Sequence, residues 1–186
     1  MFTTPEDDLA HILASQQYWI DKAKALRASA AAIWHYIDSN PPLDLSSALA
    51  TAPPIEKTGI WNVYRMLCGM SLELAYKASL IAMGQKIKIT HDLNWLAQQV
   101  LPSVSRKERG ILELLTQCIV WDGRYPAPKD TLSLEYFVYL SYENLYRKEQ
   151  TENTMTLKPI EPDPLSWENY NSLWQSAIAA YEWHSS

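Results

Sequence analysis

Apolar residues that recur at the period of an α-helix are the feature that most constrains the fold of this chain. Between Pro5 and Ser39 they run along one helical face: Leu9, Ile12, Leu13, Trp19, Ile20, Ala23, Leu26, Ala30, Ile33, Trp34 and Ile37. A spacing near 3.6 residues predicts one long helix with room for a kink. Thr4 is the expected N-cap, and Asn40-Pro41-Pro42 is expected to end the segment.

Five further helical segments follow, separated by residues that begin or end helices. Their expected spans are residues 58–83, 91–100, 106–122, 132–150 and 167–183. Thr90 and Ser166 are expected to cap two of them, and Ser105 with Glu108 has the spacing of a capping box. Gly84 is placed to end the first of these five segments, residues 58–83.

Proline-containing stretches connect these segments. Residues 41–57 are expected to form a loop with a short turn at Ser46–Ala50, residues 124–129 a stiff connector, and 151–165 a loop or linker. No strand-like alternation is sustained, so the sequence predicts an all-α fold, an antiparallel bundle of about five to six helices. We expect residues 1–150 to form this bundle, with 151–186 adding a linker and a C-terminal helix packed on the same domain.

Composition narrows the class of protein. The chain has 186 residues, 47% of them hydrophobic, which is typical of one globular domain. Its net charge of −5 does not attract nucleic acid to the molecule as a whole. Cys68 and Cys118 lie in apolar helical stretches without metal-ligand spacing, so we expect buried free thiols, no metal and no cofactor. No export signal and no membrane-length apolar run occur, which favours the cytoplasm and no membrane contact.

Three ionisable residues on the second and third segments are candidates for chemistry. Glu73 and Lys77 have the i, i+4 spacing of a helix-surface ion pair. His91, at the start of the next helix, has the near-neutral pKa that suits a proton donor or acceptor. A capping or packing role also explains His91, and we favour that role.

The sequence Trp121-Asp-Gly-Arg-Tyr-Pro126 is the most unusual local arrangement in the chain. Gly123 permits a sharp helix exit, and the proline fixes the direction of the chain beyond it. Arg124 on this corner could hold a phosphate or carboxylate through two hydrogen bonds. It could also donate to the unpaired carbonyl groups of a helix end, and we favour that structural role.

Tyrosines recur in the segment 132–150, at positions 136, 139, 142 and 146. Aromatic side chains of this kind stack on nucleobases in some RNA-binding proteins. They are also common in cores and interfaces, and Phe137, Leu140 and Leu145 interleave with them here. We therefore favour a role in the core or in an interface over nucleobase stacking.

Two stretches, Arg65-Met-Leu-Cys-Gly-Met-Ser-Leu-Glu-Leu-Ala-Tyr-Lys77 and Thr90-His-Asp-Leu93, together resemble the HEPN superfamily. The order and spacing of the helices across residues 5–150 are similar to that family as well. The resemblance implies an antiparallel helical bundle that is frequently a homodimer. It also implies a prokaryotic toxin–antitoxin, phage-defence or nucleotide-related system.

Active HEPN members are metal-independent ribonucleases that use an Arg-x4-6-His motif, and this motif is absent here. Arg27 precedes His35 by too long an interval, and the other arginines have no histidine within range. Lys86 stands at the permitted interval before His91, but lysine lacks the planar fork of arginine. The resemblance therefore implies a fold without the catalytic assignment.

These observations favour a non-catalytic HEPN-like binding domain that is a homodimer and binds a protein partner or a nucleotide or RNA ligand. Its hypothetical ligand site comprises Lys77, Lys86, His91, Arg124 and Tyr125. One alternative is a ribonuclease with a displaced active site that uses His91 with Arg124 or Lys86. Another is an assembly element whose last helix docks on a second protein.

Overall fold

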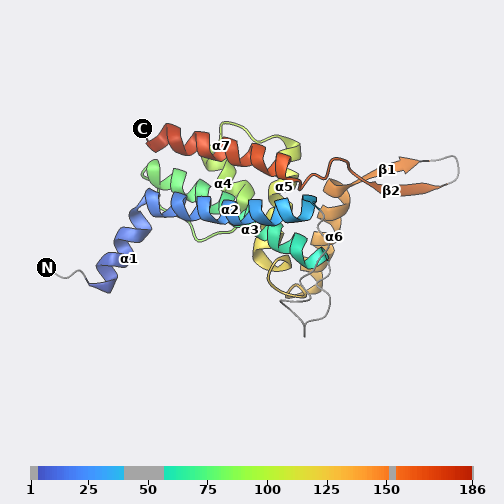
Figure 1. The fold of residues 1–186 in the computed structure, drawn as a ribbon, viewed down its shortest axis with the longest axis horizontal. Coiled ribbons are helices and arrows are strands. Elements are labelled where there is room, and N and C mark those ends of the chain that lie inside the picture. The colour runs from blue at the N-terminus through green and yellow to red at the C-terminus, as the bar shows by residue number, and fades with distance from the viewer. Residues whose placement is uncertain (1–3, 40–56, 151–153, 186) are drawn as a thin grey trace.

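The computed structural model describes residues 4–39, 57–150 and 154–185. Within these ranges the chain is mostly helical, which confirms the predicted all-α bundle (Figure 1). The helices are α1 (Pro5–Ala14), α2 (Gln16–Ser39), α3 (Lys57–Ala82), α4 (Leu93–Val100), α5 (Arg106–Gln117), the π-helical turn η1 (Cys118–Asp122), α6 (Thr131–Leu145) and α7 (Trp167–Ser185). None of the helices in these ranges has the length and apolar character needed to cross a bilayer.

Helix α3 lies at the centre of the bundle. Its buried residues occur on all sides of the helix and not along a single stripe. It runs antiparallel to α2 and also packs against α4, α5, η1 and α7. Tyr64, Leu72 and Tyr76 of α3 are fully buried. At the junction with α2, Trp34, Trp61 and Tyr64 form an aromatic cluster with ring centroids 5.4–5.8 Å apart. Burial of large apolar side chains on this scale is the main stabilising term of the fold.

The first predicted helix is divided at Ser15, so the chain uses the room that its length left for a kink. Helix α2 packs along α3, whereas α1 turns away and projects from the helical body (Figure 1). The indole Nε1 of Trp19 donates to the carbonyl oxygen of Leu13 at 3.3 Å and bridges the break.

The helix caps agree with the sequence in most cases. Ser105 and Glu108 make the predicted capping box, each accepting from the other's backbone N–H. The predicted cap at Thr90 is wrong, because Asp92 caps α4 by accepting from the amide of Trp95 at 2.9 Å. Thr90 instead accepts from the amide of Asp92 at 3.1 Å. The loop predicted at 41–57, with its turn at Ser46–Ala50, lies almost entirely outside the described residues.

The prediction of a helix to residue 150 followed by an irregular linker is wrong. Helix α6 ends at Leu145, and the chain continues as an antiparallel hairpin of β1 (Tyr146–Gln150) and β2 (Met155–Pro159). Glu149 accepts from Lys158 at 2.6 Å and lies 3.2 Å from Arg147, so ion pairs stabilise the two strands. The hairpin projects from the end of the molecule opposite α1 (Figure 1).

After the hairpin, α7 runs back along α3. The packing of α7 on the core includes a hydrogen bond. The hydroxyl groups of Ser71 and Tyr170 lie 2.7 Å apart inside the protein. Ser166 precedes α7 and accepts weakly from the amide of Asn169 at 3.5 Å, as its predicted capping role requires. The C-terminal helix is therefore part of the same packed body as α3.

Candidate functional site

A buried carboxylate on α3 organises the first candidate site. Glu73 is 6% exposed, and so is Lys77 one turn later. Lys77 Nζ donates to Glu73 Oε1 at 2.6 Å, so the predicted ion pair forms. The expectation that the pair lies on the helix surface is wrong, because α3 is enclosed by its neighbours. Because both side chains are buried, loss of either one would leave an unpaired buried charge, which is strongly destabilising.

The second oxygen of Glu73 holds His91. Its Oε2 lies 2.9 Å from His91 Nδ1. Because an ionised carboxylate only accepts hydrogen bonds, Nδ1 of His91 is the donor in this contact. The His91 side chain is 52% exposed and has no other hydrogen bond to the described residues. Glu73 therefore fixes the ring orientation and leaves Nε2 turned toward solvent, an arrangement that can accept a proton or bind an acidic group.

An open groove borders the other side of the ion pair. It has a volume of about 800 Å³ and is bounded by the end of α1, by Trp19, by Lys77 and by residues 84–89. Its walls are mainly apolar, and Lys86 and Lys88 supply further positive charge. The Lys77 ammonium lies 5.9 Å from the centroid of the Trp19 ring, and Lys88 lies 4.9 Å from that of Trp95. These lysines are thus partly positioned by aromatic rings.

Arg124 and Tyr125 follow Gly123, which packs on a different turn of α3 from the one that carries Glu73. Gly123 packs so closely on Met66 that an added Cβ would come within 2.5 Å of the Met66 Cβ. Met66 precedes Glu73 by seven residues, about 10 Å along a helix axis. Arg124 Nη2 donates to the carbonyl of Val120 at 2.8 Å, which confirms the favoured helix-end role.

The structure therefore groups the five predicted ligand residues in two sets. Lys77, Lys86 and His91 surround Glu73 or the adjoining groove. Arg124 and Tyr125 form hydrogen bonds to η1, and the Arg124 guanidinium lies 5.5 Å from the centroid of the Tyr125 ring. Sequence reasoning did not assign Glu73 as the shared partner of Lys77 and His91. Glu73 lies in the first of the two stretches that carry the resemblance, and His91 lies in the second. This co-occurrence was the signal that could have identified Glu73.

A second candidate surface lies on α6 and the hairpin. Helix α6 has one buried residue, Leu140, although most of its side chains are apolar or aromatic. We define the tyrosine face as the exposed side chains of Leu132, Tyr136, Tyr139 and Tyr142 on α6, with Tyr146, Met155 and Leu157 on the hairpin. The rings of Tyr142 and Tyr146 lie 5.9 Å apart and join the two parts.

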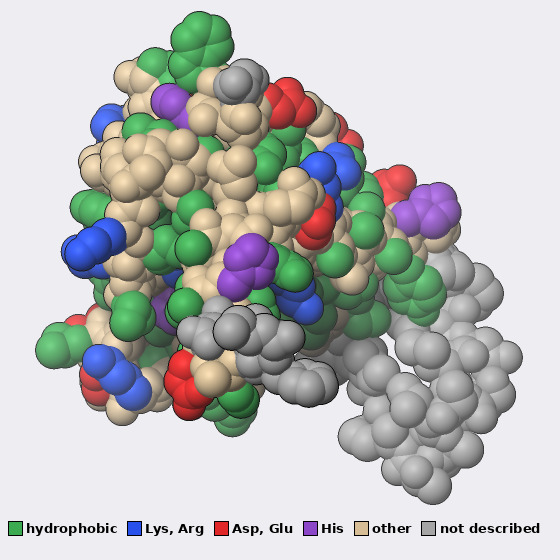
Figure 2. All heavy atoms as spheres, turned by 90° about the vertical axis from the view of Figure 1, so that its left-hand side faces the viewer, with side chains coloured by type: hydrophobic (Ala, Val, Ile, Leu, Met, Phe, Trp, Pro, Cys, Tyr) green, Lys and Arg blue, Asp and Glu red, His purple; other side chains and the backbone are tan. Residues whose placement is uncertain are grey.

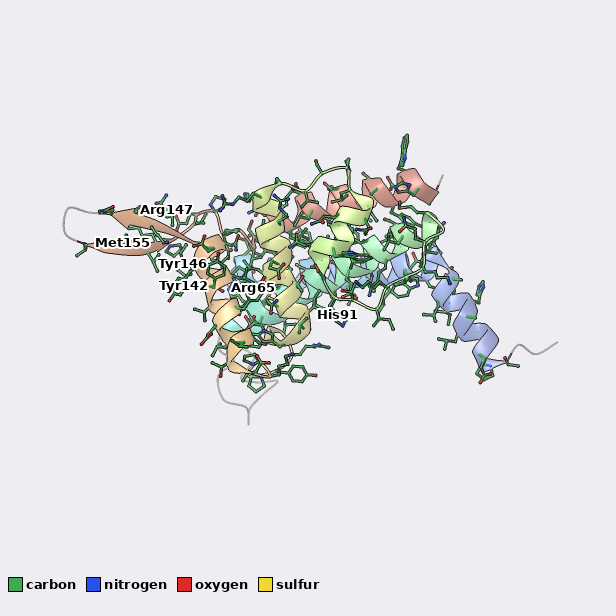
Figure 3. The ribbon with its side chains drawn as sticks, turned by 180° about the vertical axis from the view of Figure 1, so that it is seen from behind. Arg65, His91, Tyr142, Tyr146, Arg147 and Met155 are labelled. Atoms are coloured by element: carbon green, nitrogen blue, oxygen red, sulfur yellow. The ribbon has the colours of Figure 1, made fainter. Side chains whose placement is uncertain are left out.

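Figure 3 shows Tyr142, Tyr146, Arg147 and Met155 following one another from α6 onto the hairpin, with His91 well apart on the helical body. The tyrosine face and the Glu73 cluster are therefore separate surfaces. An extended surface of large apolar side chains with polar tips is typical of protein–protein interfaces.

The remaining reactive groups are structural. Cys68 and Cys118 are free and buried, as predicted. Burial raises the pKa of the Cys118 thiol to about 12, so this sulfur is protonated and unreactive. Among the described residues, no group of three or more histidine, cysteine, aspartate or glutamate side chains is arranged to bind a metal ion.

Comparison with known proteins found no matching family model, no matching curated protein and no matching solved structure. The two surfaces above are therefore interpreted from their own geometry.

Proposed function

We propose that this chain is a non-catalytic, HEPN-like binding domain that works as a homodimer and binds a protein partner on the tyrosine face. In keeping with the resemblance, we place it in a prokaryotic toxin–antitoxin, phage-defence or nucleotide-related system. The observation that carries the proposal is the amount of aromatic and aliphatic surface that α6 and the hairpin leave exposed. An isolated two-stranded hairpin is only marginally stable in water, which favours its being covered by a partner.

The charges of the tyrosine face indicate the kind of protein that would bind there. By the register of the strands, Lys148 lies beside Leu157 on the tyrosine face, whereas Arg147, Lys158 and Glu149 lie on the other face of the hairpin. Arg147 and Lys158 both pair with Glu149, whereas Lys148 has no ion pair among the described residues. Exposed Glu135 and Glu143 share this side of α6, so a partner with an apolar patch edged by charges of both signs would complement the surface.

The HEPN part of the proposal is supported by a contact between the two stretches that carry the resemblance. Glu73, from the first stretch, hydrogen-bonds Lys77 of the same stretch and His91 of the second. Two motifs that are separated along the chain thus meet at one buried carboxylate. The ion pair neutralises Lys77, which leaves it poorly suited to binding a ligand.

Site-specific crosslinking tests the binding proposal. A photo-crosslinking amino acid replaces Tyr139, which is 59% exposed, in cells that naturally produce the chain. Tyr18 on α2, which is 53% exposed, is the matched control. We expect one protein to be crosslinked from position 139 and not from position 18. Its affinity for the purified chain should fall at least about tenfold in Tyr139→Arg and stay unchanged in Tyr18→Arg. The same set of proteins at both positions would contradict the proposal.

One observation favours a second candidate function, a metal-independent ribonuclease. Glu73 orients His91 with Nε2 outward, as a proton-accepting histidine requires. Labelled RNA incubated with the purified chain and a chelator tests it. We expect no cleavage; cleavage that disappears in His91→Ala would establish the ribonuclease instead.

A further inference from the structure

Helix α1 is an exposed amphipathic helix. It has only ten residues, and every one whose side chain is described is exposed to solvent. Helices of this length are marginal in water unless an apolar face packs against something. Leu9, Ile12 and Leu13 are 56%, 44% and 49% exposed and form such a face. The apolar face of α1 is therefore largely uncovered in a single copy of the chain.

The charges of α1 are concentrated at its N-terminal end. Glu6 and Asp8 belong to its first turns, and neither forms an ion pair among the described residues. Their carboxylates favour the helix through its dipole and stay available for an outside cation. An acidic helix of this kind is repelled by the anionic lipids that attract basic interfacial helices. The chemistry of α1 thus favours a protein surface over a membrane.

The groove at the base of α1 has the complementary character. Apolar side chains of Trp19, Ile81 and Ile87 line it. Besides Lys77, which Glu73 neutralises, its charged lining residues are Lys86 and Lys88, and neither has an ion pair among the described residues. Ile89, at its rim, is 99% exposed. Figure 2 views this end of the molecule and shows hydrophobic side chains beside both basic and acidic ones. An acidic amphipathic helix would match both the apolar walls and the charge.

We propose that this helix is α1 of a second copy, and that two copies exchange these helices reciprocally. In each copy Leu9 and Ile12 enter the groove of the other, and Glu6 and Asp8 face Lys86 and Lys88. The exchange is isologous, because each chain contributes both the helix and the groove. Within one chain α1 forms only a wall of the groove, through Ala10, Leu13 and Ala14, so its other apolar side chains need a second chain. The inference rests on the proposed function in taking the domain to be a homodimer.

Mass measurement on the full chain tests the exchange. Sedimentation equilibrium gives the dimer dissociation constant for the natural chain, for Leu9→Glu and for Leu132→Glu. Leu132 of the tyrosine face is 75% exposed, against 56% for Leu9, so this control places the same charge on a more accessible leucine of a different surface. We expect Leu9→Glu to raise the dissociation constant at least about tenfold and Leu132→Glu to leave it unchanged. Unchanged circular dichroism spectra confirm that both variants fold.

A charge exchange provides the second measurement. Lys86→Glu and Asp8→Lys should each weaken the dimer, and the two together should restore it. If the single variants weakened the dimer by unfolding the chain, the double variant would not restore it. The same holds if the dimer were built on another surface. A dimer that is unaffected by Leu9→Glu, or is weakened by Leu132→Glu instead, overturns the exchange while leaving the homodimer intact. A natural chain that stays monomeric at every concentration overturns the exchange and the homodimer together.

Discussion

Helices α3 and α6 use the same residue types in opposite ways. Tyr64 and Tyr76 of α3 are fully buried, whereas Tyr136, Tyr139 and Tyr142 of α6 are 44–59% exposed. Both helices look apolar in sequence, so composition alone does not distinguish them. The difference arises from position, because α3 is surrounded by five neighbouring elements and α6 lies at one end of the bundle. Tyrosines therefore stabilise the fold on α3 and provide a contact surface on α6.

The largest expected effect comes from removing one ring on each helix. Tyr76→Ala leaves a cavity in the core and should lower the free energy of unfolding by about 3–5 kcal/mol. Tyr139→Ala removes an exposed ring and should change it by less than about 0.5 kcal/mol. Urea denaturation followed by circular dichroism measures both. Equal losses would show that α6 is as much a part of the core as α3.

Removing one tyrosine hydroxyl group from each helix sharpens the contrast between α3 and α6. We expect the free energy of unfolding to change in opposite directions. The Tyr76 hydroxyl is buried and has no hydrogen-bond partner among the described residues, so Tyr76→Phe should stabilise the fold by up to about 1 kcal/mol. The Tyr136 hydroxyl donates to Glu113 at 3.0 Å, so Tyr136→Phe should destabilise it by about 0.5 kcal/mol. Urea midpoints of the two variants supply the comparison. Destabilisation by Tyr76→Phe would indicate a bound water on that hydroxyl.

Tyr136 also provides a titration signal for the contact between α5 and α6. Partial burial, together with its bond to Glu113, raises the pKa of its phenol to about 12. A pH titration of tyrosine absorbance should show the transition of Tyr136 move to lower pH in Glu113→Gln. No movement would mean that the bond to Glu113 does not form in solution.

The smallest effect is expected at Asp122, where the chain leaves the core for α6. Burial raises the pKa of its carboxyl above the ordinary value, so ionisation costs the folded state stability. This cost is present at pH 7 and disappears as pH falls below the ordinary value of 3.8, where folded and unfolded chains are both protonated. Asp122→Asn should therefore raise the melting temperature slightly at pH 7 and lose this advantage near pH 3. An advantage that is independent of pH would exclude this cause.

Much of the helical fold could be predicted because helix signals are local. The apolar period, the capping box at Ser105 and the closing glycine at position 84 each depend on a few neighbouring residues. The hairpin was missed because its strands are short and exposed on both faces, so they lack the alternation that marks a half-buried strand. A strand of this kind becomes recognisable only with its partner.

The candidate site was harder to predict because it depends on distant parts of the chain. The i, i+4 spacing indicated the pair of Glu73 and Lys77, but burial of that pair depends on elements that pack around α3 from elsewhere in the sequence. His91 joins the pair across 18 residues. Conversely, Arg124 was a plausible member by chemistry alone, and its contacts with η1 hold it at a different level of α3.

The aromatic cluster of Trp34, Trp61 and Tyr64 has a spectroscopic consequence. Its rings are held at fixed tilts of 39–82° to one another, so their electronic transitions should couple and produce near-ultraviolet dichroism. Trp34 is on α2, whereas Trp61 and Tyr64 are on α3, so the part of this signal that Trp34 contributes requires α2 to be docked on α3. The far-ultraviolet signal requires only that helices exist. Recording both during refolding would therefore time the docking of the two helices separately from their formation.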